Sequence, residues 1–336
     1  MATTSAGEGD REVPIAENLE NQHELDASYD GDTYDFIRGE TQTIGSSIYA
    51  FRNENGRSYH AYKEGQYWGP NDQQQSEQLD IAHQAYLILF DNKLFFAPLT
   101  DPKRVLDLGT GTGTWACDFA DEFPNAQVIG TDLSPIQHQA VPPNCQFEID
   151  DATDEWTFEK DSFDYIHVRG FYGSIADWPE FYKKVLAHLK PGGYFEQVEY
   201  SVTWIADDGS VPEGHAFERW SKLFVEAGEK IGRTFRILDL QTDFIKEAGF
   251  TNVTERKFKM PVGPWSSDPK LKSVGRYHLL ECYEGIEGWS MALLTRLYGW
   301  SFEQVQEFLD EVRQGFKDRS VHAYTSVTVT WAQKPS

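Results

Sequence analysis

The chain has 336 residues, of which 40% are hydrophobic and 14% aromatic, enough for the core of one elaborated α/β unit. Its 54 acidic and 30 basic residues give a net charge of −24, and Lys183–Lys184 and Lys257–Lys259 are isolated basic pairs. A phosphate backbone or an anionic membrane surface would be repelled, and no stretch approaches the roughly 20 apolar residues that span a bilayer. We therefore expect neither nucleic acid nor a membrane as a partner.

The cysteines and the N-terminus indicate the compartment. Cys117, Cys145 and Cys282 are scattered, with no metal-ligand spacing and no even set to pair. This pattern is typical of reduced thiols and predicts no metal site. The chain does not open with a basic segment followed by an apolar one, as a secretory signal would. We expect a cytoplasmic or nuclear protein.

Two segments are expected ahead of the main domain. Residues 1–40 hold eleven acidic residues against two basic ones, a composition typical of a solvated, disordered arm, which we bound at 1–42. Residues 43–98 are expected to form a helical cap. Its helix should begin after Asn71 or Asp72 as N-cap. One face of this helix carries Leu79, Ala82, His83, Tyr86, Leu87 and Phe90.

The main domain is expected over residues 99–336 as a parallel, doubly wound sheet, because predicted strands and helices alternate from Arg104 onward. Strands are predicted at 104–108, 127–131, 145–149, 163–168 and 194–202, and helices from 114 and over 179–189. Further helices are predicted within 212–231, 239–248 and 269–316, and strands at 251–259 and 321–331. We expect the last two strands to pair around a helical insertion at about 264–318, after an earlier insertion at about 205–235.

Acidic residues lie at or just after the carboxyl ends of three of these strands. Asp107 lies two residues before Gly109, the start of a glycine-rich turn, Asp132 ends the next strand, and Asp150 and Asp151 follow the third. A glycine turn between a strand and a helix lets the backbone approach a ligand, although many nucleotide-binding proteins share it. This turn, GTGTG, lacks the third-glycine spacing of the dinucleotide motif, and a carboxylate before it would repel a diphosphate.

The acids match three parts of one ligand. Asp107 suits the ammonium of an amino acid, and Asp132 is placed to accept both hydroxyls of a ribose. Asp151 lies where an acid commonly meets the adenine amino group in this fold. Together they predict S-adenosylmethionine as the cofactor.

The same segments resemble known families. Five resemble motifs I to V of the class I methyltransferases: VLDLGTGTG from 105, IGTDLSP from 129, IDDAT from 149, FDYIHVR from 163 and LKPGGYFEQVE from 189. Four are similar to the fungal LaeA-like family of such enzymes: ENGRSYHAYKEGQYWGPND from 54, DYIHVRGFYGSIADW from 164, PVGPW from 261 and HAY from 322. The similarity spans nearly all of residues 43–336.

This resemblance implies a Rossmann-like, seven-stranded, mostly parallel sheet with an antiparallel last strand and helical cap insertions. It places four residues around the methionine part of the cofactor: Asp107, Gly109, Gly111 and Gly113. Asp132 would bind the ribose and Asp151 with Ala152 the adenine, Leu133 joins this cofactor-binding set, and Arg169 would face the cofactor beneath the substrate pocket. One departure is visible, because Gln78 stands where the family usually has arginine, and this weakens the case for a salt bridge that fixes the cap.

Methyl transfer is an in-line displacement whose main demand is alignment, and a base is needed only when the nucleophile arrives protonated. Candidate bases are His83, Glu199 and His322, although His83 could equally be a packing residue. His167, inside an apolar strand, is more typical of a hydrogen-bonded core histidine. Three aromatic residues are candidates for the substrate pocket, with core packing as the alternative: Tyr67, Tyr172 and Trp265.

Three functions remain open. The first is methylation of oxygen, or of nitrogen, on a small hydrophobic secondary metabolite, and Val168–Tyr172 lacks the turn typical of methylases of exocyclic amines on bases. The second, implied by the resemblance, is a regulatory methyltransferase that acts on or with protein partners such as histones or velvet-type complexes. The third is a protein that keeps the cofactor without catalysis.

Overall fold

The computed structural model describes residues 51–60 and 67–336. The predicted acidic arm, 1–42, lies outside these residues, as does part of the predicted cap segment. The described part of the cap contains a short antiparallel hairpin and a long helix: β1 Arg52–Glu54, β2 Arg57–Tyr59 and α1 Gln73–Leu89.

The main domain is built on one sheet, to which seven strands contribute in the described part of the chain. They are β3 Arg104–Leu108, β4 Gln127–Asp132, β5 Cys145–Ile149, β6 Phe163–Arg169, β7 Leu189–Tyr200, β8 Thr251–Pro261 and β9 Tyr324–Gln333. Their order is β5-β4-β3-β6-β7-β9-β8. Strands β3 to β7 pair in parallel, while β9 runs antiparallel to both of its neighbours. The predicted fold class is confirmed.

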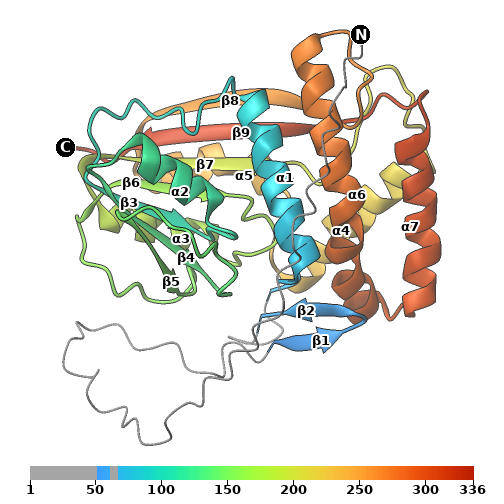
Figure 1. Ribbon diagram of the computed structural model, residues 1–336, viewed down its shortest axis with the longest axis horizontal. Helices are drawn as coiled ribbons and strands as arrows, with labels where there is room; N and C mark the ends of the chain where they lie inside the picture. Colours follow the sequence, from blue (N-terminus) through green and yellow to red (C-terminus); the bar gives the residue numbers. More distant parts are fainter. Residues whose placement is uncertain (1–50, 61–66) are drawn as a thin grey trace, which may run out of the picture. The chain divides into compact units, whose positions relative to one another are not determined.

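Helices flank this sheet and fill the insertions (Figure 1). Beyond α1 they are α2 Thr114–Glu122, α3 Trp178–His188, α4 Ala216–Ile231, α5 Ile237–Glu247, α6 Pro269–Tyr298 and α7 Phe302–Lys317. Helices α6 and α7 stand between β8 and β9 in the chain, and those strands pair along most of their length. The predicted strand pair with a helical insertion is therefore confirmed.

Two boundaries differ from the prediction for local reasons. The helical stretch 269–316 is divided into two, because Gly299 takes a left-handed conformation with φ of +69° and Ser301 starts α7 with a capping box to Gln304, a combination that ends one helix and begins another. Strand β7 begins at Leu189 rather than at Tyr194. Leu189 already pairs with Phe163, before a register shift at the glycines that follow.

The cap helix α1 is fixed at its start by an ion pair. Asp72 is its N-cap and accepts a hydrogen bond from the Gln75 amide at 3.0 Å. The same carboxylate receives two hydrogen bonds from the buried guanidinium of Arg57, at 2.6 and 2.8 Å. Helix α1 then runs alongside α6 and reaches α2 (Figure 1). The predicted N-cap is confirmed, and the hairpin anchors the helix that covers the sheet's edge.

Candidate active site at the carboxyl edge of the sheet

Two adjoining cavities lie where β3 to β6 end. The strand-end cavity contains Asp132 and Asp151, whereas the cap cavity is covered by α1 and α6 and contains His83 and Glu281. Because parallel strands present their carboxyl ends at one edge, side chains far apart in sequence converge there. The two cavities, together called the cleft, adjoin each other and share eight lining residues: Tyr67, Gly69, Gln75, Leu79, Gly109, Gly111, Arg169 and Gly170.

The glycine turn forms the wall common to both cavities. Gly109 has φ of +62°, and a Cβ there would lie 2.1 Å from the ring of Phe171, so a side chain is excluded by both backbone and space. Gly113 does not line either cavity within the described chain. Its φ is +82°, and a Cβ would lie 2.3 Å from the ring of Phe147. The prediction that Gly113 contacts the ligand is therefore not favoured, because packing explains this glycine.

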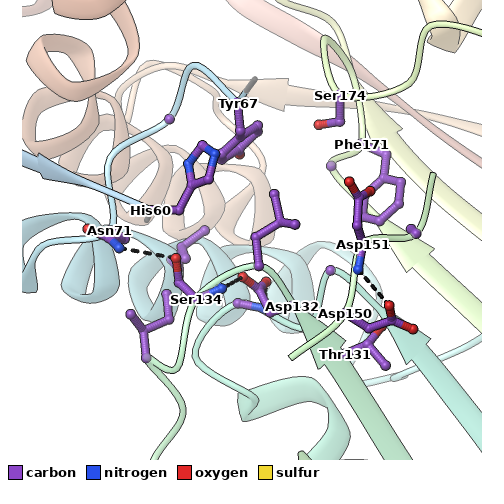
Figure 2. Close-up of a pocket in the computed structure, with 18 of the residues that line it drawn as sticks. His60, Tyr67, Asn71, Thr131, Asp132, Ser134, Asp150, Asp151, Phe171 and Ser174 are labelled. Atoms are coloured by element: carbon purple, nitrogen blue, oxygen red, sulfur yellow. Dashed lines mark hydrogen bonds between the residues drawn. The ribbon is translucent and has the colours of Figure 1, made fainter. Parts of the chain in front are cut away.

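Asp132 faces the strand-end cavity from the end of β4 (Figure 2). Its carboxylate accepts hydrogen bonds from the Gly111 amide at 2.9 Å and the Ser134 amide at 3.0 Å. The Ser134 hydroxyl in turn accepts from Asn71 at 3.1 Å, which ties this strand end to the cap. Desolvation in the cavity raises the pKa of Asp132 to about 6, while the two amides oppose that shift.

Asp151 lies on the other side of the same cavity, with Ala152 and Leu133 as further lining residues. Its carboxylate accepts from the backbone amide and the hydroxyl of Thr153, at 2.8 and 2.7 Å. Its own amide donates to Asp150 at 2.8 Å (Figure 2). These local bonds hold the loop after β5 as a rigid edge of the cavity.

Asp107 is buried at the end of β3 and borders the cap cavity. It accepts hydrogen bonds from Nδ1 of His167 at 2.7 Å and from the Thr110 hydroxyl at 2.6 Å. The His167 ring stacks on Trp115 with centroids 3.7 Å apart. Burial lowers the pKa of His167, and Asp107 opposes that shift. His167 is thus the hydrogen-bonded core histidine that its strand position indicated.

Arg169 and His83 link the sheet to the cap. Arg169 ends β6 and lines both cavities, and His83 lies on α1. The guanidinium Nη1 is 3.2 Å from Nδ1 of His83, whose Nε2 is 2.9 Å from the carboxylate of Asp118. The Arg169 guanidinium also lies over the Tyr86 ring, 5.1 Å from its centroid. Its positive charge therefore lies at the junction of the two cavities.

Two predicted bases lie elsewhere. Glu199 is fully buried and, in the described structure, does not line either cavity. Its carboxylate accepts from the amides of Phe171 and Tyr172 at 2.9 and 3.2 Å, so it holds the turn after β6. His322 pairs with Asp208 at 2.6 Å, on the exposed side of the β9 start. We correct both assignments, because neither side chain reaches the cleft.

Of the three aromatic residues predicted to line the substrate pocket, two line the cleft and one does not. Tyr67 lines both cavities and Tyr172 lines the cap cavity, where its hydroxyl bonds to that of Tyr200. Trp265 instead lines a different hollow with residues of α6 and α7 and donates to the Ala323 carbonyl at 2.9 Å. Its predicted place in the substrate pocket is wrong, because it packs against the start of β9.

The sequence prediction missed several lining residues. On α1, two buried glutamines, Gln75 and Gln78, lie on the same buried face as His83 and several apolar residues. On α6, Glu281 is 2% exposed in a helix rich in aromatic residues. Polar residues on a buried helix face are the signal that marks these positions, but only the packing of α1 against α6 brings them together.

The sheet order, the glycine turn and the strand-end acids define a class I, S-adenosylmethionine-dependent methyltransferase. The family described as "Methyltransferase domain" matches residues 81–255. The chain is 38% identical to methyltransferase pytC of Aspergillus terreus over 87% of this chain and 91% of that protein. It is 37% identical to the secondary metabolism regulator laeA of Aspergillus flavus, over 85% and 78% of the two chains. A protein-methionine methyltransferase laeA of Emericella nidulans is 36% identical, over 85% and 77%.

The chain therefore belongs to the LaeA-like family of fungal methyltransferases. The cleft has the chemistry that this cofactor requires. Asp132 would offer a carboxylate to the ribose hydroxyls, the backbone of Gly109, with its positive φ and no side chain, would allow close approach of the ligand, and Arg169 would present a cation to the methionine carboxylate. The bound cofactor supplies an electrophilic methyl group, and the chain's part is to hold it against an acceptor.

Proposed function

We propose that this methyltransferase acts on an oxygen of a small hydrophobic metabolite. The observation that carries the proposal is the lining of the cap cavity. Nine of its residues are aromatic or aliphatic: Tyr67, Trp68, Leu79, Ala82, Tyr86, Trp115, Tyr172, Tyr200 and Trp289. Ten residues with polar or charged side chains share this lining, so the cavity suits a small organic ligand that has both an aromatic or aliphatic body and groups that form hydrogen bonds.

The cofactor would then occupy the strand-end cavity and the shared wall. We assign the adenine to Asp151, the ribose to Asp132 and the methionine carboxylate to Arg169. The acceptor would enter the cap cavity beside α1 and α6. In this arrangement the cap excludes water from the methyl group, while the Gly109 turn sets the alignment.

A second candidate acceptor is a protein. It is favoured by two relatives, one named a secondary metabolism regulator and one a protein-methionine methyltransferase. A thioether acceptor has no proton to lose, so it needs no base.

Among residues 51–60 and 67–336, none of the helices combines the length and apolar character needed to cross a membrane.

Transfer of a labelled methyl group separates the two acceptors. The full chain is incubated with methyl-labelled S-adenosylmethionine and three acceptor sources: protein-free fungal extract, core histones, and the enzyme alone. We expect label in the organic-soluble fraction of the extract and none with Asp132→Ala. Label confined to histones or to the enzyme itself would reject the metabolite acceptor in favour of a protein one.

A further inference from the structure

The cap cavity contains a short chain of buried polar side chains that the cofactor assignment does not use. Gln75 donates from Nε2 to Oε1 of Gln78 at 2.6 Å, and Gln78 donates from Nε2 to Oε1 of Glu281 at 3.3 Å. All three are buried, with exposures of 9%, 3% and 2%. In both hydrogen bonds the donor lies on the Gln75 side and the acceptor on the Glu281 side, and the second bond joins helix α1 to helix α6. Gln75, Gln78 and Glu281 are called the relay below.

The relay leaves acceptor atoms without donors. Oε2 of Glu281 and Oε1 of Gln75 are buried and have no hydrogen-bond partner among the described residues. An unmet buried acceptor costs free energy unless a ligand satisfies it. The amide oxygen only accepts, and the carboxylate only accepts when it is ionised, so the missing partner of the ionised form must bring an O–H or N–H group.

Glu281 lies on the acceptor side of the cleft. Asp132 and Asp151 line only the strand-end cavity, whereas Glu281 lines only the cap cavity. Gly109 and Arg169 line both, so a cofactor held by these four residues reaches the cap cavity with its methionine end. Asp107, expected to hold the methionine ammonium, also lines the cap cavity, so the methionine end and the acceptor share this cavity, and we place the acceptor on its α1 and α6 side, where Glu281 lies.

We infer that Glu281 is the catalytic base and that the acceptor presents a hydroxyl group to its Oε2. This inference rests on the proposed methylation of oxygen. As the acceptor oxygen forms its bond to the methyl carbon, the carbon–sulfur bond breaks and its electron pair stays on sulfur. The hydroxyl proton passes to Oε2 of Glu281, which ends neutral.

The surroundings of Glu281 suit a proton acceptor. Burial raises the pKa of this carboxyl to about 8, opposed by Arg169 and by the hydrogen bond from Gln78. The other titratable groups that interact with it electrostatically are the neighbouring thiol of Cys282 and three tyrosines, from α1, the turn after β6 and the end of β7: Tyr86, Tyr172 and Tyr200. Their own pKa values are raised by burial, so they stay neutral while Glu281 changes charge. A base is most effective when its pKa lies near the working pH.

The test uses phenol, whose hydroxyl stays protonated at mildly alkaline pH. The full chain is saturated with sinefungin, a cofactor analogue that carries an ammonium group and transfers no methyl, and phenol binding is measured by calorimetry from mildly acidic to mildly alkaline pH. Because an ionised carboxylate accepts a hydrogen bond from a hydroxyl better than a neutral carboxyl does, the affinity of wild type for phenol should rise about tenfold as the pH passes through about 8. Glu281→Gln should bind phenol with an affinity that does not change with pH, and Glu281→Leu should bind it about tenfold more weakly than wild type does at alkaline pH.

Controls separate this inference from the proposed function. Glu284→Gln, one turn further along α6 and outside both cavities, should behave as wild type. Several results would overturn the base assignment: phenol that fails to bind wild type loaded with sinefungin, an affinity of wild type that does not rise with pH, or the same pH dependence in the Glu281 variants. Loss of sinefungin binding in Glu281→Gln would also overturn it, by placing Glu281 in the cofactor site. Wild type that does not bind sinefungin at all would instead refute the cofactor site itself.

Discussion

The guanidinium of Arg169 and the imidazole of His83 lie 3.2 Å apart, Nη1 to Nδ1, and join the end of β6 to the cap helix α1. Because a guanidinium only donates, Nδ1 of His83 must accept, and Nε2 carries the proton that is donated to Asp118. Burial lowers the pKa of His83, which keeps the ring neutral, although Asp118 opposes the shift. The histidine thus fixes the direction in which Arg169 presents its charge.

Replacing His83 should weaken cofactor binding. In His83→Phe the guanidinium loses its partner, and we expect about a tenfold rise in the dissociation constant for S-adenosylmethionine, measured by calorimetry. Asp118→Asn is the matched control, since its side chain is 42% exposed and contacts only the far side of the ring. An affinity in His83→Phe equal to that of wild type would show that Arg169 does not need this support.

Cofactor affinity should depend on the charge of Asp132. Its pKa of about 6 lies above the usual 3.8, so protonation begins at a mildly acidic pH. A protonated carboxyl accepts hydrogen bonds from ribose hydroxyls less well, and affinity should therefore fall as the pH drops through about 6. Titrations of wild type and Asp132→Asn across this range check the assignment. Asp132→Asn should bind S-adenosylmethionine more weakly than wild type, with an affinity that does not change with pH. Affinities of wild type and variant that fall in parallel as the pH drops would contradict the assignment.

Two histidine–aspartate pairs should differ in their contribution to stability. His167 and Asp107 are both buried, and His167→Leu leaves the carboxylate with one partner, which should cost about 3 kcal/mol in the free energy of unfolding. His322 and Asp208 are exposed, and His322→Leu should leave the urea midpoint unchanged. Equal losses in the two variants would mean that burial does not set the strength of these pairs.

The sheet could be predicted from the sequence because its strands carry strong local signals. Strand β3 is a short apolar run that ends in a glycine turn, and the predicted bounds of β5 agree with the structure, Cys145–Ile149. The break between α6 and α7 is also a local signal, in Gly299 and Ser301. It was missed because the aromatic pattern continues on both sides.

The acceptor side of the site could not be predicted in the same way. Asp107, Asp132 and Asp151 lie at or just after the carboxyl ends of strands, and parallel strands bring their ends together whatever the rest of the chain does. Gln78 and Glu281 meet only because α1 packs along α6, some two hundred positions away in the chain. Periodicity assigns a residue to a helix face, but it does not say which helix that face will contact. Glu199 was wrongly assigned for a different reason. Its position near the end of a strand is evident from the sequence, but that position does not reveal that its carboxylate holds the neighbouring turn.

Calorimetry with S-adenosylmethionine tests the central claim most directly. We expect the full chain to bind one equivalent, and we expect both Asp132→Ala and Asp151→Ala to weaken binding by at least about tenfold. Asp121→Ala, an exposed aspartate on α2, should bind as wild type does. Absence of binding by wild type, or wild-type affinity in Asp132→Ala, would contradict the assignment of this cleft to the cofactor.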